Sequence, residues 1–149
     1  MTERCVELVK KFEGFSDYPY RCPAGYLTIG YGKVIYPKMK IEIPLSKEKA
    51  EELLIEDLLK IEKIISPLIQ VKIHPYMMDA LISFSYNVGC YAFKVSTLRK
   101  KINKKEFLDA SNEFLKWVYA GGKKLKGLER RRQAERALFL EGVKLLFKY

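Results

Sequence analysis

Three side chains near the N-terminus combine residue types that acid–base chemistry uses. Glu13 is followed after eight residues by Cys22, and Cys22 after five residues by Thr28. A carboxyl can donate a proton, a thiol can act as a base or a nucleophile, and a hydroxyl can orient a water molecule. Thr28 also opens the segment Thr-Ile-Gly-Tyr-Gly, in which Gly30 and Gly32 let the backbone approach a ligand closely.

Each of these residues also has a purely structural explanation. A glutamate at a helix end is most often a solvated surface residue, and a threonine before a glycine most often belongs to a strand. In the same way, Cys22 is explained as a small, half-buried residue that tolerates water beside Thr28. The residue types alone leave both explanations open.

The elements that must position these residues follow from the apolar pattern. Apolar residues at helical spacing from Cys5 to Phe12 predict a first helix that ends near Glu13. Residues 15–36 are rich in Tyr, Ile and Val and are interrupted by Gly and Pro, which predicts a small hairpin or a three-stranded sheet. Glu13 then lies where helix meets sheet, so its side chain can project into a cleft between them.

The rest of the chain is predicted to be helical. Ser46 is suited to cap a long helix, which Pro67 ends or kinks. His74 and Pro75 begin the next helix, and 77–88 is apolar on nearly all sides, as in a central buried helix. Ser96 caps a short helix. Further helices are expected around 107–117 and over 128–140, with a basic loop at 121–127 between them.

Composition limits the classes of partner. The formal charge of +10 favours an anionic partner, either nucleic acid, an acidic membrane surface or a cell-wall polymer, or it merely keeps the surface soluble. Nucleic acid is the poorest of these, because the basic residues are dispersed and no recognition motif is present. Three cysteines without a CxxC pair and a single histidine predict reduced thiols, no metal site and no cofactor. Neither a signal peptide nor a stretch able to span a bilayer is expected.

Three stretches together resemble the phage-type lysozymes, the T4-like endolysins of glycoside hydrolase family 24. The spacing of Glu13, Cys22 and Thr28 matches the family signature of Glu, eight residues, Asp or Cys, five residues, Thr. Residues 79–98 resemble the family's central helix and the turn after it, and residues 117–136 resemble its C-terminal part. The three stretches follow in the family's order and cover nearly the whole chain.

The resemblance implies an α+β, mostly helical, lysozyme-like fold in one domain. A small N-terminal β-sheet lobe with its linking helix would take up about residues 13–65. Residues 66–149 together with the N-terminal helix 1–12 would form the helical C-terminal lobe. The long helix would join the two lobes across the cleft.

The activity implied is hydrolysis of the β-1,4 bond between N-acetylmuramic acid and N-acetylglucosamine in peptidoglycan. By position, Glu13 would be the general acid, and Thr28 would hold the attacking water on the opposite face of the sugar. An acid in that role must keep its proton near neutral pH, which partial burial favours. The remaining carried-over positions are Val34, Tyr86 and Asn87 as saccharide-binding residues, Gly30 and Gly32 as supporting glycines, and Arg131 (or its neighbours Arg130 and Arg132) as a partner of Glu13.

Two positions depart from the commonest family pattern. Much of the family has Asp where this chain has Cys22, although Cys is an attested alternative. A free thiol with a pKa of about 8.5 is only a few per cent ionised at pH 7, so Cys22 acts either as a base, as a nucleophile or only as packing; the three-part spacing favours a catalytic role. Lys33 replaces the His that commonly follows the Gly-Tyr-Gly turn, so local packing is expected to differ there.

Three functions follow for comparison. The first is a monomeric phage endolysin, made in the host cytoplasm and dependent on a separate holin to reach peptidoglycan and anionic wall polymers. The second is a lytic transglycosylase on the same bond, which needs Glu13 but no water-activating group. The third is an idle, basic wall- or membrane-binding protein that uses the arginine-rich helix 128–140 and the tail 143–149. Retention of Thr28 favours hydrolysis, so the first is our prediction.

Overall fold

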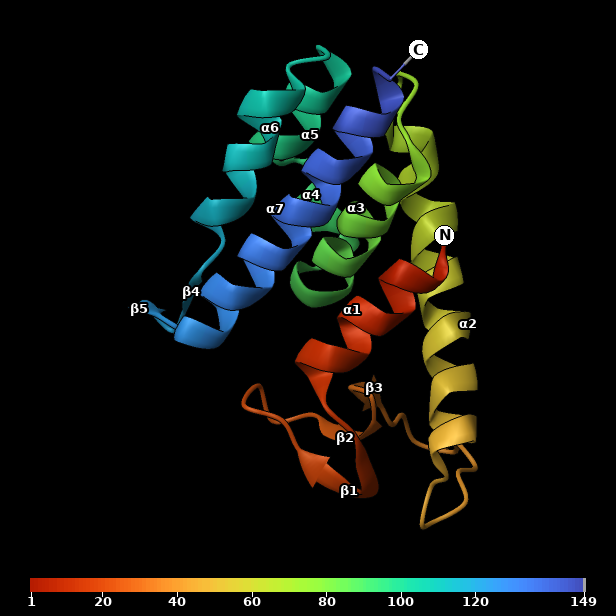
Figure 1. Cartoon of the computed structure of the whole chain (residues 1–149). Helices are drawn as coiled ribbons and strands as arrows, with labels where there is room; N and C mark the ends of the chain where they lie inside the picture. Colours follow the sequence, from red (N-terminus) through yellow and green to blue (C-terminus); the bar gives the residue numbers. More distant parts are fainter. Residues whose placement is uncertain (149) are drawn as a thin grey trace.

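A computed structural model describes residues 1–148, and Tyr149, the last residue of the tail named above, lies outside them. Helices make up most of this part, and a small sheet lies at one end of α1 and beside α2 (Figure 1). The elements run in the order α1 (Glu3–Glu13), β1 (Ser16–Arg21), β2 (Leu27–Gly30), β3 (Lys33–Val34), α2 (Lys47–Ile65), η1 (Ser66–Leu68), α3 (Pro75–Val88), α4 (Cys90–Lys94), α5 (Thr97–Asn103), α6 (Phe107–Glu113), η2 (Phe114–Lys116), β4 (Tyr119–Ala120), β5 (Lys123–Lys124) and α7 (Lys126–Leu146).

Helix α1 begins and ends with well-defined caps. The Thr2 hydroxyl accepts a hydrogen bond from the Arg4 backbone N–H at 3.1 Å, which satisfies one of the free amides of the first turn. At the other end Gly14 has a φ of 69°, where a helix cannot continue and where glycine is unstrained. The helix therefore ends at Glu13, as the sequence predicts, and leaves that carboxyl at the junction with the sheet.

The N-terminal sheet has three antiparallel strands in the order β1-β2-β3. Thr28 of β2 pairs with Tyr20 of β1 on one side and with Val34 of β3 on the other. A register irregularity in β1 lies between Ser16 and Tyr20. Of the two arrangements that the sequence allows, the three-stranded sheet is the one observed, and it places the Thr28 segment at its centre.

Helix α2 is the long helix that the sequence predicts. Ser46 caps it by accepting a hydrogen bond from the Lys49 backbone N–H at 3.1 Å. The helix ends at Ile65, and Pro67 lies in the 3-10 turn η1 that follows. Figure 1 shows α2 running from beside the sheet to the helical part of the molecule. Its buried residues Leu54 and Leu58 pack in the common core.

Helix α3 is the buried centre of the helical part. The His74 ring accepts a hydrogen bond from the Tyr76 backbone N–H at 3.0 Å, so this histidine caps the helix as the sequence suggests. Residues 79–85 are all buried, and α3 packs along α7 and against α1 and α2. Phe84 contacts the aromatic rings of Phe93, Phe114 and Trp117 edge-on. These contacts join α3 to α4, η2 and the Trp117 segment within the core.

Two expectations near the C-terminus are wrong in detail. The basic loop expected at 121–127 is a tight hairpin of β4 and β5, because Gly121 (φ 58°) and Gly122 (φ 78°) form the kind of turn that joins antiparallel strands. The last helix is also longer than 128–140, since it starts at Lys126 and runs to Leu146. Its apolar residues Leu138, Phe139 and Val143 are buried in the core, and so do not form a free membrane-binding face.

The described residues confirm the predicted fold class, an α+β fold that is mostly helical with a small sheet near the N-terminus. Among residues 1–148, no helix is both long enough and apolar enough to cross a bilayer.

Candidate active site

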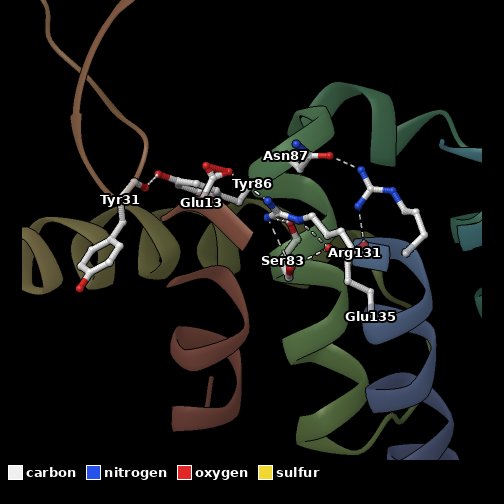
Figure 2. Close-up of polar contacts among 8 residues, drawn as sticks. Glu13, Tyr31, Ser83, Tyr86, Asn87, Arg131 and Glu135 are labelled. Atoms are coloured by element: carbon white, nitrogen blue, oxygen red, sulfur yellow. Dashed lines mark hydrogen bonds and ion pairs between the residues drawn. The ribbon is translucent and has the colours of Figure 1, made fainter. Parts of the chain in front are cut away.

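Glu13 is held by an arginine from the far end of the sequence. Arg131 of α7 donates from Nη1 to Glu13 Oε1 at 3.0 Å, so the two residues form an ion pair between α7 and the end of α1 (Figure 2). The Arg131 side chain is 4% exposed, while that of Glu13 is 20% exposed. The carboxylate is thus fixed from its buried side and faces solvent on the other.

Arg131 is itself held by three further contacts, two with Ser83 and one with Glu135. Its Nη2 donates to the Ser83 backbone carbonyl at 3.1 Å, and its Nε donates to Glu135 Oε2 at 3.2 Å. The Ser83 hydroxyl also donates to Glu135 Oε2, at 2.6 Å. A buried arginine with all its directions occupied cannot swing away, so Glu13 has a partner of fixed position.

A second arginine completes this buried network. Arg132 donates from Nη1 to Glu135 Oε1 at 2.6 Å, from Nε to the Trp117 carbonyl at 2.9 Å, and from Nη2 to Asn87 Oδ1. Both Arg132 and Glu135 are fully buried. Burial lowers the pKa of Arg132, and the Glu135 carboxylate opposes that effect. One buried carboxylate therefore orients two arginines, of which one reaches Glu13 and the other Asn87.

Two glycines of the segment 28–32 lie where a side chain has no room. A Cβ at Gly32 would stand 2.6 Å from Glu13 Oε2 and 3.4 Å from the Tyr86 hydroxyl, and its φ is 82°. A Cβ at Gly30 would stand 3.1 Å from Leu45 and 3.3 Å from Ala50 of α2, and its φ is 66°. Gly32 therefore lets the backbone contact the acid directly, whereas Gly30 lets the sheet pack on α2.

A cleft runs past the carboxyl of Glu13 and consists of two adjoining hollows. The first hollow, of about 490 Å³, lies between the sheet, α2 and α3. The second hollow, of about 520 Å³, lies between the end of α1 and the start of α7. The first is lined by residues that include Glu13, Gly32, Val34, Asp57, Tyr86 and Asn87, and the second by residues that include Lys11, Glu13, Asn87, Arg130 and Arg131. Glu13 and Asn87 lie at the junction of the two.

Tyr86 is fixed at the edge of this junction. Its hydroxyl donates to the Tyr31 backbone carbonyl at 2.8 Å, which ties α3 to the segment 28–32 (Figure 2). Burial, with a further contribution from the Glu13 carboxylate, raises the pKa of Tyr86, so the phenol stays protonated and remains a donor. Tyr86 and Val34 both line the first hollow, as expected of saccharide-binding residues.

Cys22 and Thr28 lie together on the β1–β2 hairpin. The Cys22 backbone N–H donates to the Tyr26 carbonyl at 2.9 Å, which closes the turn. The Thr28 hydroxyl donates to the same Tyr26 carbonyl at 3.0 Å. Burial of the thiol opposes its ionisation, but the neighbouring backbone of Tyr26 and Ala24 and the Thr28 side chain outweigh this and lower the pKa of Cys22. The thiol is half-buried and free, so the group whose pKa is lowered is one that solvent can reach.

The hairpin pair is separate from the hollows around Glu13. Neither Cys22 nor Thr28 is among the described residues that line the first or the second hollow. Tyr20 pairs with Thr28 across the sheet and lies near enough to both Glu13 and Cys22 for their charges to affect its pKa. Its pKa is raised chiefly by burial, with smaller contributions from Glu13 and Cys22. The structure thus brings Glu13, Gly32, Val34, Tyr86, Asn87 and Arg131 together, and places Cys22 and Thr28 beside this group.

Lys33, the departure noted in the sequence, has a partner in α2. Its Nζ lies 3.0 Å and 3.1 Å from the two carboxylate oxygens of Asp57. In the sequence, Asp57 is the one acidic residue within the apolar stripe of α2. Its ion pair with Lys33, in the lining of the first hollow, explains why a charge stands there.

Nothing among residues 1–148 forms a group of three or more His, Cys, Asp or Glu side chains that can hold a metal ion. The candidate site contains the carboxyl of Glu13, the thiol of Cys22, hydroxyl groups, the amide of Asn87, and arginines held by a buried carboxylate. Sequence reasoning identified Arg131 as one of three candidates but missed Ser83 and Glu135. One pattern in the sequence could have revealed Glu135: it follows Arg131 by four residues on a predicted helix, which is the spacing of an intrahelical ion pair.

The chain is similar in sequence to known proteins. The family model described as phage lysozyme matches residues 10–135. An endolysin of Bacillus phage B103 is 42% identical over 92% of this chain, which spans 52% of that protein's length. An endolysin of Acyrthosiphon pisum secondary endosymbiont phage 1 is 38% identical over 93% of this chain and 97% of its own length.

A solved structure is also similar to this chain. The muramidase domain of SpmX from Asticaccaulis excentricus superimposes with a TM-score of 0.84 at 31% identity, over 93% of this chain and 96% of that chain. The matched region contains Glu13, Cys22, Thr28 and the buried arginines of α7. This chain belongs to the phage lysozyme family.

Proposed function

We propose that this chain is an endolysin-type lysozyme that hydrolyses the β-1,4 bond between N-acetylmuramic acid and N-acetylglucosamine in peptidoglycan. The observation that carries the proposal is the carboxyl of Glu13, held by buried Arg131 at the junction of two hollows. A glycan strand that lies across both hollows places a glycosidic bond at this carboxyl. The endolysin and muramidase relatives support the same reaction class.

Glu13 is the general acid in this proposal. Arg131 occupies Oε1, while Oε2 lies against Gly32 at the mouth of the first hollow. Oε2 is therefore the oxygen that gives its proton to the leaving glycosidic oxygen. Arg131 prevents the carboxyl from rotating, so the proton is presented in one direction.

Cys22 and Thr28 take the water-handling role. The lowered pKa of Cys22 supports a thiolate that accepts a proton from water, and the neighbouring Thr28 hydroxyl orients that water. In this assignment the two sides of the sugar ring are served by different elements. The acid comes from the end of α1, and the base from the β1–β2 hairpin.

The proposal is tested with Glu13→Gln on purified peptidoglycan. We expect a fall of about 10²–10⁴-fold in the rate of muropeptide release, since glutamine has no acidic proton, while the variant stays folded because its amide oxygen can still accept from Arg131. Glu7→Gln is the matched control, because Glu7 lies on the same helix with 72% of its side chain exposed. Residual hydrolysis close to that of wild type would remove Glu13 from the role of acid.

The same digest separates hydrolysis from the transglycosylase reaction. Mass spectrometry of the released ends shows reducing muramic acid after hydrolysis and 1,6-anhydro muramic acid after transglycosylation. Release of neither, with binding that survives Glu13→Gln, would indicate a wall-binding protein without this activity.

Wall binding and access to the wall complete the proposal. The charge of +10 favours adsorption to anionic wall polymers by a monomer, so lysis should weaken as salt is raised. In producing cells we propose that the enzyme depends on a separate holin. Lysis that starts only when a holin is co-expressed supports this dependence, and lysis by the chain alone contradicts it.

A further inference from the structure

Asn87 is the polar side chain that the network behind Glu13 reaches at the C-terminal end of α3. It is exposed, and it lines both hollows together with Glu13. Its carbonyl oxygen Oδ1 accepts a hydrogen bond from Nη2 of Arg132. Asn87 therefore faces the cleft while being held from behind by a residue that does not line either hollow.

Arg132 has no freedom to follow a moving partner. Its other contacts are the Trp117 carbonyl at 2.9 Å and Glu135 Oε1 at 2.6 Å, and its guanidinium lies 5.1 Å from the centre of the Phe84 ring. The side chain is fully buried. Nη2 is consequently a donor fixed in space, and the oxygen of Asn87 must come to it.

The contact decides which way the Asn87 amide points. A guanidinium only donates hydrogen bonds, so the amide oxygen must face Arg132 and the NH₂ group must face away. Figure 2 shows this arrangement, with the oxygen of Asn87 toward the guanidinium and the nitrogen on the opposite side. Among the described residues, no hydrogen bond from this NH₂ group is present, so its donors are available to a ligand.

We propose that Arg132 is a positioning residue that fixes Asn87 as a hydrogen-bond donor to an N-acetyl carbonyl of the glycan. This inference rests on the proposed function, because it takes peptidoglycan as the substrate. An amide carbonyl is the strongest neutral acceptor on these sugars, and it is carried on the carbon next to the one at the cleaved bond. A donor beside Glu13 at the junction of the hollows is therefore well placed to bind it.

The first test replaces Asn87 with a group of the same shape and no donor. Asn87→Asp keeps an oxygen for Arg132 but presents an acceptor to the cleft, so we expect KM for peptidoglycan fragments to rise about 10-fold or more. The unfolding midpoint should not fall. Asn112→Asp is the matched control, since Asn112 Oδ1 accepts from Arg136 Nη2 at 3.1 Å on an exposed surface. An unchanged KM in Asn87→Asp overturns the proposal.

The second test replaces the guanidinium of Arg132, which donates from three nitrogens, by an ammonium group. Arg132→Lys keeps the positive charge beside Glu135 but cannot hold Trp117, Glu135 and Asn87 together. We expect KM to rise about 3- to 10-fold, with kcat changed less than about 2-fold. If Arg132 acts only in stability, the variant unfolds more easily while the folded fraction keeps its KM, and that result overturns the positioning role.

The third test addresses the group that is bound. Binding of a peptidoglycan tetrasaccharide and of its de-N-acetylated form is measured by calorimetry in the Glu13→Gln background, where no turnover occurs. We expect de-N-acetylation to weaken binding more in Asn87 protein than in Asn87→Ala protein. Equal weakening in both means that Asn87 does not bind the N-acetyl group. Failure of the proposed function is distinguishable, because wild type would then release no muropeptides at all.

Discussion

On the helical side of the candidate site, Glu13, Arg131 and Glu135 form one continuous network. On its hairpin side, Cys22 and Thr28 lie outside the two hollows and are held by the backbone of their own turn. The first group comes from α1 and α7, which are distant in sequence, and its arginines are almost fully buried. The second group is local and half-buried. Glu13 is thus fixed by the core, and Cys22 by a turn.

This difference predicts which positions tolerate exchange. A buried charge cannot lose its partner without a large cost, so the helical side must be kept as a set. Cys22 stands in a local turn, where a carboxyl or a thiol can receive the same backbone hydrogen bonds. The family signature, with Asp or Cys at this position, is consistent with that tolerance.

The largest effect is expected when the helical network is broken. Arg131→Met removes the partner of Glu13 and leaves Glu135 with one arginine instead of two. We expect the free energy of unfolding to fall by about 3–5 kcal/mol, since a buried charge loses a partner, and urea unfolding measures it. Arg130→Met is the control, because Arg130 is exposed; similar losses in both variants would mean that the buried network is not special.

A smaller effect is expected when only the contact between sheet and acid is changed. Gly32→Ala places a methyl group 2.6 Å from Glu13 Oε2, so the carboxyl must move. We expect kcat/KM on peptidoglycan to fall about 100-fold, the usual cost of a displacement near 1 Å. Gly122→Ala is the control. The φ of Gly122 is 78°, close to the 82° of Gly32, but no atom lies within 4 Å of the carbon that the substitution adds. Equal activity losses in the two variants would attribute the effect to backbone strain alone.

The smallest effect concerns the hairpin side, where the ionisation of Cys22 should make it the most reactive of the three thiols near neutral pH. Because the hydrogen-bonding surroundings of Cys22 lower its pKa, its thiolate forms at lower pH than it would without them. Burial raises the pKa of Cys5 and of Cys90. Iodoacetamide at pH 7 should therefore modify Cys22 first, as peptide mass spectrometry would show. Modification of Cys90 at the same rate would contradict a favoured thiolate at Cys22.

The sequence predicts the local features of this molecule well. The end of α1 at Glu13, the caps at Ser46 and His74 and the buried α3 all depend on patterns within a few residues. The glycines of 28–32 are also predictable as points of close approach. The groups that these glycines approach cannot be predicted in this way, because Glu13 and Gly32 come into contact only when α1 packs on the sheet.

Contacts between distant elements account for what the sequence did not reveal. Arg130, Arg131 and Arg132 are indistinguishable as a run, yet one is exposed, one holds the acid and one holds Asn87. Their roles depend on the rotation of α7 against α3, which is decided by Leu138, Phe139 and Val143 in the core. Lys33 and Asp57 are likewise two unremarkable charges until β3 lies beside α2.

The most direct test of a two-sided site is digestion of purified peptidoglycan by wild type and by Cys22→Ala, with mass spectrometry of the muropeptide ends. The account predicts reducing muramic acid ends from wild type, and the same ends at a rate lower by about 10²-fold from Cys22→Ala, since a base is lost while the acid stays in place. Anhydro ends that form at the same rate in both would contradict it, because Glu13 would then act without a water-handling partner on the hairpin.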